Sequence, residues 1–346
     1  METAPDLWRM GARELAQAIS SRKASSREVV EAHLRRVEAV NPAINAVTIL
    51  LAEEALEAAE VADRRVAAGG DLPPLLGVPF TVKGNIDLLA SPTTQGLKVS
   101  AEAYPTRDAP AIERLRAAGA IPLGHTNLAN LAVRWHCVSE VWGATINPWN
   151  RSLTPGASTG GEAAALATGM TSLGVGADGL GSLRWPAQCC GVSALKPTLG
   201  RVPNASTIEP ANQPIGAQLL VAVGPMARRV SDLRAAFEVM AGPTWRDPWS
   251  VPVPLRGPGP ARPVRVALRR RPRRPGRRPA NSRRRAEGSG GTGGRRLQRP
   301  GSGAALDRGG GPRRSRDAQH SRMPGGYPAN AGHVSCRHTP VPFRFL

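Results

Sequence analysis

The segment TPGASTGGEAAALATGMTSLGVGADGLGS (154–182) decides the fold of this 346-residue chain. It begins with a glycine- and serine-rich loop, and the small-residue stretch 162–170 predicts a helix. The apolar run that follows predicts a buried strand ending in a glycine turn. Residues 77–84, 108–118 and 120–124 show the same alternation as strand, helix and strand. Strands that alternate with helices of this length predict an α/β fold, with helices packed on both faces of a sheet.

Helices are also predicted on either side of this core. Residues 6–68 predict helical hairpins, in which Ser25 and Glu28 form a capping box at the start of one helix. Asn41–Pro42 predicts the end of that helix. The stretch 227–242 predicts a further amphipathic helix.

The positive charge of the chain is concentrated near its C-terminus. The chain has 46 Lys and Arg against 26 Asp and Glu, a net charge of +20. Residues 269–346 carry +17 of it, with 20 Arg and no Lys, and 43 of these 78 residues are Arg, Gly or Pro. Such a segment buries too little apolar surface to fold. We therefore predict an α/β domain over 1–268, with N-terminal helices at about 6–68 and a catalytic core at about 75–242, followed by a disordered tail.

The composition of the tail allows three interpretations. An Arg/Gly-rich segment can bind RNA or DNA phosphates, or an anionic membrane surface. The absence of lysine and the scarcity of aromatic residues favour the third, an out-of-frame translation of a GC-rich coding region. Translating the gene from about codon 268 in the other two frames tests this hypothesis, because a frameshift predicts that the α/β pattern continues past codon 346. If the hypothesis holds, we expect low stability and weak or absent activity.

The cysteine pattern and the N-terminus predict a cytoplasmic protein. Cys137, Cys189, Cys190 and Cys336 are too few for a disulfide scaffold and form no C-x-x-C zinc motif. The N-terminus lacks the apolar segment of a secretory signal, and no run of about 18 apolar residues predicts a membrane span. We expect neither a metal nor an organic cofactor.

Two short motifs indicate other enzyme classes, but their contexts do not fit. GVGADG (174–179) matches the dinucleotide-binding pattern, yet Pro186 makes the following segment a poor helix and no acidic residue lies about 20 positions on. GASTG (156–160) matches the nucleophile elbow of α/β-hydrolases, yet the residues before it do not predict a strand. The later histidines that such a hydrolase needs all lie in the tail. This class of serine hydrolase is the weaker alternative.

Three segments, in their order and spacing, resemble the amidase signature family. They are GVPFTVKGNID (77–87), TPGASTGGEAAALATGM (154–170) and ADGLGSLRWPAQCCGVSALKPTLGRV (177–202), and the resemblance covers roughly residues 10–268. It implies an amidase-signature fold, in which a mixed central sheet is covered by helices on both faces. It also implies that the C-terminal part of that fold is missing here.

The resemblance implies a Ser–Ser–Lys triad at Lys83, Ser158 and Ser182. Ser182 corresponds to the nucleophile, Ser158 to a bridging serine held by a cis peptide bond, and Lys83 to the base. A serine hydroxyl is a poor nucleophile at neutral pH, so a base must take its proton. Lysine serves only when neutral, and the apolar residues before Lys83 are typical of a buried site that lowers its pKa.

The resemblance also implies an oxyanion hole made by backbone N–H groups of the glycine turn: Gly179, Leu180 and Gly181, with that of Ser182. Leu180 stands where the commonest family pattern has glycine, and leucine would be strained at positive φ. Ala177 and Gly84 are milder departures from that pattern. We expect three polar residues to support the turn: Asp178, Thr159 and Arg184.

Each of these residues also has an ordinary structural interpretation. Lys83 ends a strand, where a lysine is typically a solvated surface charge. Ser158 lies four residues before Glu162 and can be a helix N-cap. Ser182 can bind the backbone donors of a tight turn. His125, His136 and Cys137 suggest a metal site by residue type but not by spacing, and we expect them to be core residues.

The sequence thus predicts an amidase that hydrolyses a carboxylic amide C–N bond through an acyl-enzyme on Ser182. The alternatives are an inactive, truncated amidase fragment and a nucleic-acid-binding protein that uses the basic tail. The expected partner is a small-molecule amide, while nucleic acid and membranes are not expected. A homodimer stays open, and an amidotransferase role in preparing aminoacyl-tRNA would require partner proteins.

Overall fold

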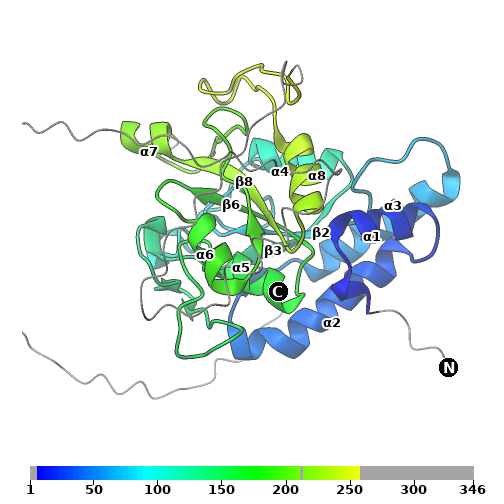
Figure 1. The fold of residues 1–346 in the computed structure, drawn as a ribbon, viewed down its shortest axis with the longest axis horizontal. Coiled ribbons are helices and arrows are strands. Elements are labelled where there is room, and N and C mark those ends of the chain that lie inside the picture. The colour runs from blue at the N-terminus through cyan, green and yellow to red at the C-terminus, as the bar shows by residue number, and fades with distance from the viewer. Residues whose placement is uncertain (1–5, 211–212, 258–346) are drawn as a thin grey trace, which may run out of the picture. The chain divides into compact units, whose positions relative to one another are not determined.

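The computed structural model describes residues 6–210 and 213–257 (Figure 1). The predicted tail, 269–346, lies outside the described residues. The elements follow one another as η1 (Leu7–Arg9), α1 (Ala12–Ser20), α2 (Ser26–Ile44), β1 (Val47–Leu50), α3 (Ala52–Ala68), β2 (Pro79–Lys83), η2 (Lys98–Ser100), α4 (Pro110–Ala117), β3 (Ile121–Thr126), η3 (Asn130–Ala132), β4 (Val138–Ser139), β5 (Gly143–Ala144), α5 (Gly160–Thr168), β6 (Leu173–Asp178), α6 (Arg184–Cys190), β7 (Ser193–Ala194), α7 (Ile215–Leu220), β8 (Ala222–Ala227) and α8 (Val230–Met240).

A mixed sheet of six strands organises the described region, in the order β1-β3-β2-β6-β8-β7. Strand β2 lies between β3 and β6 and is parallel to both. Strand β1 is antiparallel to β3, and β8 is antiparallel to β6 and β7. The four inner strands are buried along their whole length, as strands covered on both faces are. The predicted mixed α/β sheet is confirmed.

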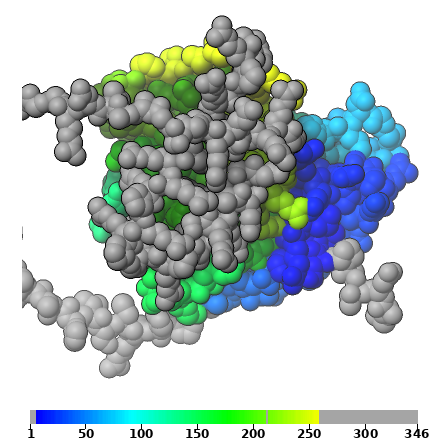
Figure 2. Space-filling model, in the orientation of Figure 1, coloured from blue at the N-terminus to red at the C-terminus, as the bar shows by residue number. Residues whose placement is uncertain are grey.

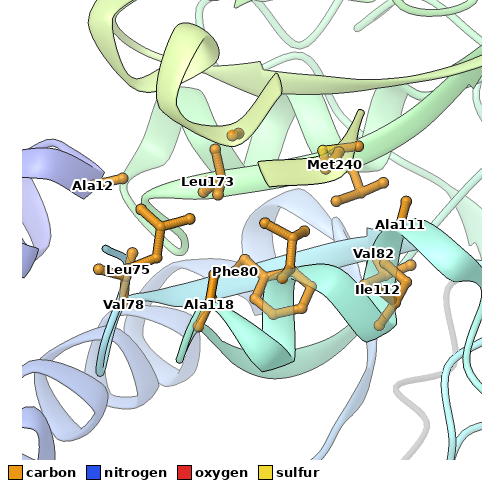
Figure 3. Packing of buried hydrophobic residues seen from close by; sticks show 14 of the residues in the cluster. Ala12, Leu75, Val78, Phe80, Val82, Ala111, Ile112, Ala118, Leu173 and Met240 are labelled. Atoms are coloured by element: carbon orange, nitrogen blue, oxygen red, sulfur yellow. The ribbon is translucent and has the colours of Figure 1, made fainter. Parts of the chain in front are cut away.

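Two apolar clusters lie on the two faces of this sheet. The larger joins α1, α4 and α8 to Val78, Phe80 and Val82 of the β2 region (Figure 3). The second joins α2, α5 and α6. Successive side chains of a strand point to opposite faces, so Thr81 and Lys83 point away from the first cluster and towards α5. The alternation along β2 therefore delivers Lys83 to the α5 face.

The N-terminal helices pack beside the α/β core, where they appear in blue in Figures 1 and 2. Helix α1 is attached to α8 by Asp232, whose carboxylate accepts hydrogen bonds from the amides of Ala12 and Arg13, both at 3.1 Å. An acidic group at a helix N-terminus binds amides that have no partner within the helix and interacts favourably with the helix dipole.

The N-terminal region differs from the prediction in two respects. The capping box of Ser25 and Glu28 is present, but α2 continues through Pro42 to Ile44, so its predicted end at Asn41–Pro42 is wrong. The side chain of Asn41 binds the chain that follows, because its Oδ1 accepts from the amides of Ala46 and Val47. The prediction of helices alone over 6–68 also missed β1, which forms the edge of the sheet.

The segment after the glycine turn was predicted to be a poor helix, and this prediction is wrong. Helix α6 begins at Arg184, so Pro186 is its third residue. The first N–H groups of a helix have no partner within it, and proline is tolerated there. The dinucleotide interpretation still fails, because Gly174 and Gly176 lie within β6 instead of in a phosphate-binding loop.

Candidate active site

Lys83 is the last residue of β2, and its side chain is completely buried. Its Nζ donates a hydrogen bond to Ser158 Oγ at 2.7 Å and a longer one to the carbonyl oxygen of Ala177 at 3.4 Å. Burial lowers the pKa of Lys83 from 10.5 to about 7, although Cys137 and Asp178 act in the opposite direction. The interpretation of Lys83 as a solvated surface charge is therefore wrong.

Ser158 lies in the loop that leads into α5 and is also completely buried. The Ala157–Ser158 peptide bond is cis, as the resemblance implied. Thr159 occupies the N-cap position of α5 and makes no side-chain capping bond, so the interpretation of Ser158 as the N-cap is wrong. The Ser158 hydroxyl instead accepts the hydrogen bond from Lys83.

The loop before Ser158 packs tightly on α6, the helix that follows Ser182. Gly156 adopts a φ of +82°, and a Cβ at this position would lie 2.6 Å from Cα of Pro186. Both the backbone conformation and the lack of space require glycine here. This contact holds the two serine-bearing segments against one another.

Ser182 lies in the turn between β6 and α6 and is partly exposed. Its carbonyl oxygen accepts a hydrogen bond from the Thr159 amide at 3.3 Å, which places Ser182 beside the Ser158 segment. Among the described residues, its hydroxyl has no hydrogen-bond partner. The structure thus joins Lys83 directly to Ser158 and brings Ser182 to them through the main chain.

Asp178 organises the turn that carries Ser182. Its buried carboxylate accepts hydrogen bonds from the amides of Gly181, Leu183 and Arg184. The Arg184 guanidinium adds two more, from Nε at 2.9 Å and from Nη2 at 3.0 Å. Burial alone would raise the pKa of Asp178, but the hydrogen bonds from Arg184 and the amides outweigh it and lower the pKa to about 2. Asp178 is therefore a carboxylate at neutral pH.

The turn presents several of the backbone donors expected for an oxyanion hole. The amide of Gly181 donates to Asp178 Oδ1 at 2.7 Å and is therefore engaged. Within the described part of the chain, the amides of Gly179, Leu180 and Ser182 have no hydrogen-bond partner. The positive φ of the turn falls on Gly181, at +122°, and Leu180 is not at positive φ. The strain expected for leucine therefore does not arise.

Exposed apolar side chains lie in and near the turn. Leu180, Trp135 and Trp185 are 76%, 62% and 39% exposed. The Trp135 ring lies close to the turn, because its Cζ3 would be 3.9 Å from a Cβ placed on Gly181. We call Trp135, Leu180 and Trp185 the apolar rim of the site. Large apolar groups left exposed beside a polar centre are typical of ligand sites.

The remaining candidates have structural surroundings. His125 is buried, its Nδ1 is 2.7 Å from Ser91 Oγ, and burial lowers its pKa to about 4. Cys137 is buried against Ala129 and Ala157, as expected for a core residue. His136 is exposed, so its predicted core position is wrong. In the described ranges, no three His, Cys, Asp or Glu side chains are grouped as a metal site requires.

Sequence analysis did not identify a buried polar cluster beside Lys83. It consists of Glu162 on α5, Thr81 on β2 and Thr126 on β3, all completely buried. Two signals could have revealed it. Thr81 and Lys83 are two residues apart on a strand and share a face, and Glu162 follows Ser158 by only four residues.

Comparison with known proteins places the chain in a family. The model of the amidase family matches residues 28–282. The chain belongs to the amidase signature family. It is 44% identical over 266 residues to an indoleacetamide hydrolase of Bradyrhizobium diazoefficiens, and the aligned region covers 77% of this chain and 51% of that relative. It is 38% identical over 246 residues to a glutamyl-tRNA(Gln) amidotransferase subunit from a Synechococcus strain, with 71% and 49% covered.

Solved structures of this family share the fold. The peptide amidase of Stenotrophomonas maltophilia is similar with a TM-score of 0.66 and 32% identity, over 72% of this chain and 51% of the peptide amidase. The chain thus spans about half the length of the amidase relatives that it matches. None of the helices in the described ranges is long and apolar enough to cross a membrane.

Proposed function

We propose that this chain is an amidase that hydrolyses a carboxylic amide C–N bond through an acyl-enzyme on Ser182. The observation that carries the proposal is the buried contact of Lys83 Nζ with Ser158 Oγ at 2.7 Å, next to a turn with free amides. At a pKa of about 7, a substantial fraction of Lys83 is neutral at physiological pH. A neutral amine accepts a proton, which an ammonium group cannot do.

The proposed reaction begins when Ser182 Oγ attacks the amide carbonyl carbon and its proton passes through Ser158 to Lys83. The amides of Gly179, Leu180 and Ser182 donate to the oxyanion of the tetrahedral intermediate. The proton then returns through Ser158 to the leaving nitrogen, the C–N bond breaks, and ammonia, or an amine from a substituted amide, departs. Water attacks the resulting ester in the same way, which releases the carboxylic acid and restores Ser182.

We further propose amides with an apolar or aromatic acyl group as substrates. The apolar rim beside Ser182 supports this class, because its three side chains offer large apolar surfaces. The similarity to an indoleacetamide hydrolase also favours it. Hydrolysis of indole-3-acetamide compared with L-glutamine tests the proposal. Faster hydrolysis of glutamine would favour chemistry closer to that of the amidotransferase relatives.

A fluorophosphonate probe tests the catalytic serine without knowledge of the substrate. We expect the full chain to be labelled, Ser182→Ala to be unlabelled, and the exposed-loop control Ser152→Ala to be labelled like the wild type. A folded wild-type protein that is not labelled would show that the chain is an inactive fragment. Labelling that persists in Ser182→Ala would assign the nucleophile to another residue.

We also propose a reducing compartment, the cytoplasm, because Cys137, Cys189 and Cys190 are free thiols. The division into a catalytic domain over 1–268 and a basic tail over 269–346 remains part of the proposal. Deletion of the tail tests nucleic-acid binding. If the full chain binds RNA or DNA in a salt-dependent way, we expect the deletion to abolish that binding. Labelling by the fluorophosphonate probe is a separate readout that depends on Ser182.

A further inference from the structure

Glu162 is a buried carboxyl group that the proposed mechanism does not use. It lies in the first turn of α5, four residues after Ser158, and reaches across the centre of the sheet. Its Oε1 accepts a hydrogen bond from Thr81 on β2, and its Oε2 lies 2.9 Å from Thr126 Oγ1 on β3. The third neighbouring strand makes room for it, because a Cβ on Gly174 of β6 would lie 2.6 Å from the Glu162 carboxyl carbon. The carboxyl group thus binds or contacts the three strands at the centre of the sheet.

The two hydroxyls that bind Glu162 flank Lys83. Thr81 precedes Lys83 by two residues on the same face of β2, and Thr126 is the register partner of Lys83 on β3. Helix α5 and the loop that leads into it are therefore tied to this part of the sheet at two points, Ser158 with Lys83 and Glu162 with Thr81. Ser158 and Glu162 are four residues apart in the chain. A shift of α5 that broke the second contact would move Ser158 relative to Lys83.

The hydrogen bonds also indicate the charge state of Glu162. Thr126 Oγ1 lies within hydrogen-bond distance of Glu162 Oε2 and, at 3.3 Å, of the carbonyl oxygen of Val82, but a hydroxyl has one proton. A carboxylic acid at Glu162 would supply the additional donor: it would donate to Thr126 and free the Thr126 proton for the carbonyl oxygen of Val82. Burial acts in the same direction, since it raises the pKa of Glu162 to about 8 despite the bond from Thr81.

No charged side chain is placed to bind Glu162 in the described part of the chain. The ionisable groups on the surrounding elements have other partners. On the strands, Lys83 binds Ser158, His125 binds Ser91 and Asp178 binds Arg184. The remaining three bind carbonyl oxygens: His33 of α2 that of Val29, Arg36 of α2 that of Thr168, and Arg228 after β8 those of Leu166 and Thr171.

We propose that Glu162 is a positioning residue that, as an uncharged carboxylic acid, fixes the start of α5 and holds Ser158 in contact with Lys83. The proposal rests on the proposed function for its catalytic consequence. Glutamine can replace a carboxylic acid here, because its amide supplies one acceptor and a donor. Alanine removes both contacts.

The first test measures fluorophosphonate labelling of the full chain. We expect Glu162→Ala to lower the limiting labelling rate about tenfold or more with unchanged probe affinity, and Glu162→Gln to stay within about threefold of the wild type. The matched control is Ser172→Ala, which removes a buried hydrogen bond of 2.8 Å to the carbonyl oxygen of Pro79 on β2, away from Ser158. We expect it to destabilise the fold and leave the labelling rate unchanged.

Equal labelling of wild type and Glu162→Ala overturns the positioning role. An unlabelled wild type instead overturns the proposed function, and the catalytic consequence with it. If Glu162→Ala does not fold, Glu162→Gln provides the test. A loss of probe labelling in Glu162→Gln as large as that in Ser182→Ala would contradict the proposal, because glutamine also supplies an uncharged donor.

The second test concerns the charge state and does not require activity. A carboxyl group whose pKa is raised from 4.5 to about 8 on folding stabilises the protein fully below 4.5 and loses this contribution as pH rises to about 8. The melting temperature of the wild type should therefore fall relative to that of Glu162→Gln between these pH values. Parallel curves for the two proteins would show that Glu162 is ionised in the fold.

Discussion

Lys83 and Asp178 are both completely buried ionisable residues of the same site, yet the fold treats their charges in opposite ways. Lys83 has no carboxylate partner among the described residues, and burial drives it towards its neutral form. The Asp178 carboxylate accepts hydrogen bonds from three amides and a guanidinium, and these hold it in its charged form. The proposed base is left without a counter-charge, whereas the acid that holds the turn is saturated with donors.

Replacing Lys83 by methionine tests the role of the uncompensated amine and should give the largest effect on rate. Methionine keeps an unbranched side chain but cannot accept a proton, so we expect probe labelling and turnover to fall by about 10²–10⁴-fold. Stability at pH 6 should be unchanged or higher, because a buried amine is replaced by an apolar group. The control is Lys98→Met, at an exposed lysine. A large loss of stability in Lys83→Met would contradict this account.

Removing Asp178 tests the opposite arrangement. In Asp178→Ala, three amides and Arg184 lose their acceptor, and we expect the free energy of unfolding in urea to fall by on the order of 3 kcal/mol, with loss of labelling. Arg184→Gln serves as the comparison. The Arg184 side chain is 57% exposed and the amides stay bound to Asp178, so its effect should be smaller. Equal effects would mean that the ion pair, and not the amides, holds the turn.

The pH dependence of stability should separate the two groups at opposite ends of the pH scale. The pKa of Lys83 is 10.5 in the unfolded chain and about 7 in the fold, so the unfolded state binds more protons between these values and stability rises with pH there. Lys83→Met should lack this rise. The contribution of Asp178 should be lost as pH falls from 3.8 towards 2. Urea unfolding of the wild type and of Lys83→Met at a series of pH values measures how the free energy of unfolding changes with pH.

The residue pattern predicted those parts of the site that depend on local chemistry. Short apolar runs revealed β2 and its terminal lysine, and glycines revealed both serine-bearing loops. Contacts across the sheet were missed because they join residues distant in the chain, as Glu162 joins Thr81 and Thr126. The engagement of the Gly181 amide by Asp178 was missed for a different reason. A turn sequence does not specify which of its amides its own side chains will bind.

Pro42 and Pro186 show where a local rule was overridden. Each lies within a helix, the first near the C-terminal end of α2 and the second in the first turn of α6. A single missing N–H at a helix end costs little when neighbouring contacts fix the chain, as Asn41 does after α2. Proline in the sequence therefore indicated the neighbourhood of a helix end but not its residue.

The central position of β2 has a consequence for the order in which the protein folds. Lys83 depends on Ser158, which lies 75 residues later, and β2 obtains its second neighbour only when β6 has been synthesised. Strand β6 in turn pairs with β8 at residues 222–227. Contacts so distant in sequence form slowly, because a long loop must close before they stabilise anything. We therefore expect a nascent chain on the ribosome to stay unreactive towards the probe until β8 has emerged, long after all three residues of the proposed triad have been translated.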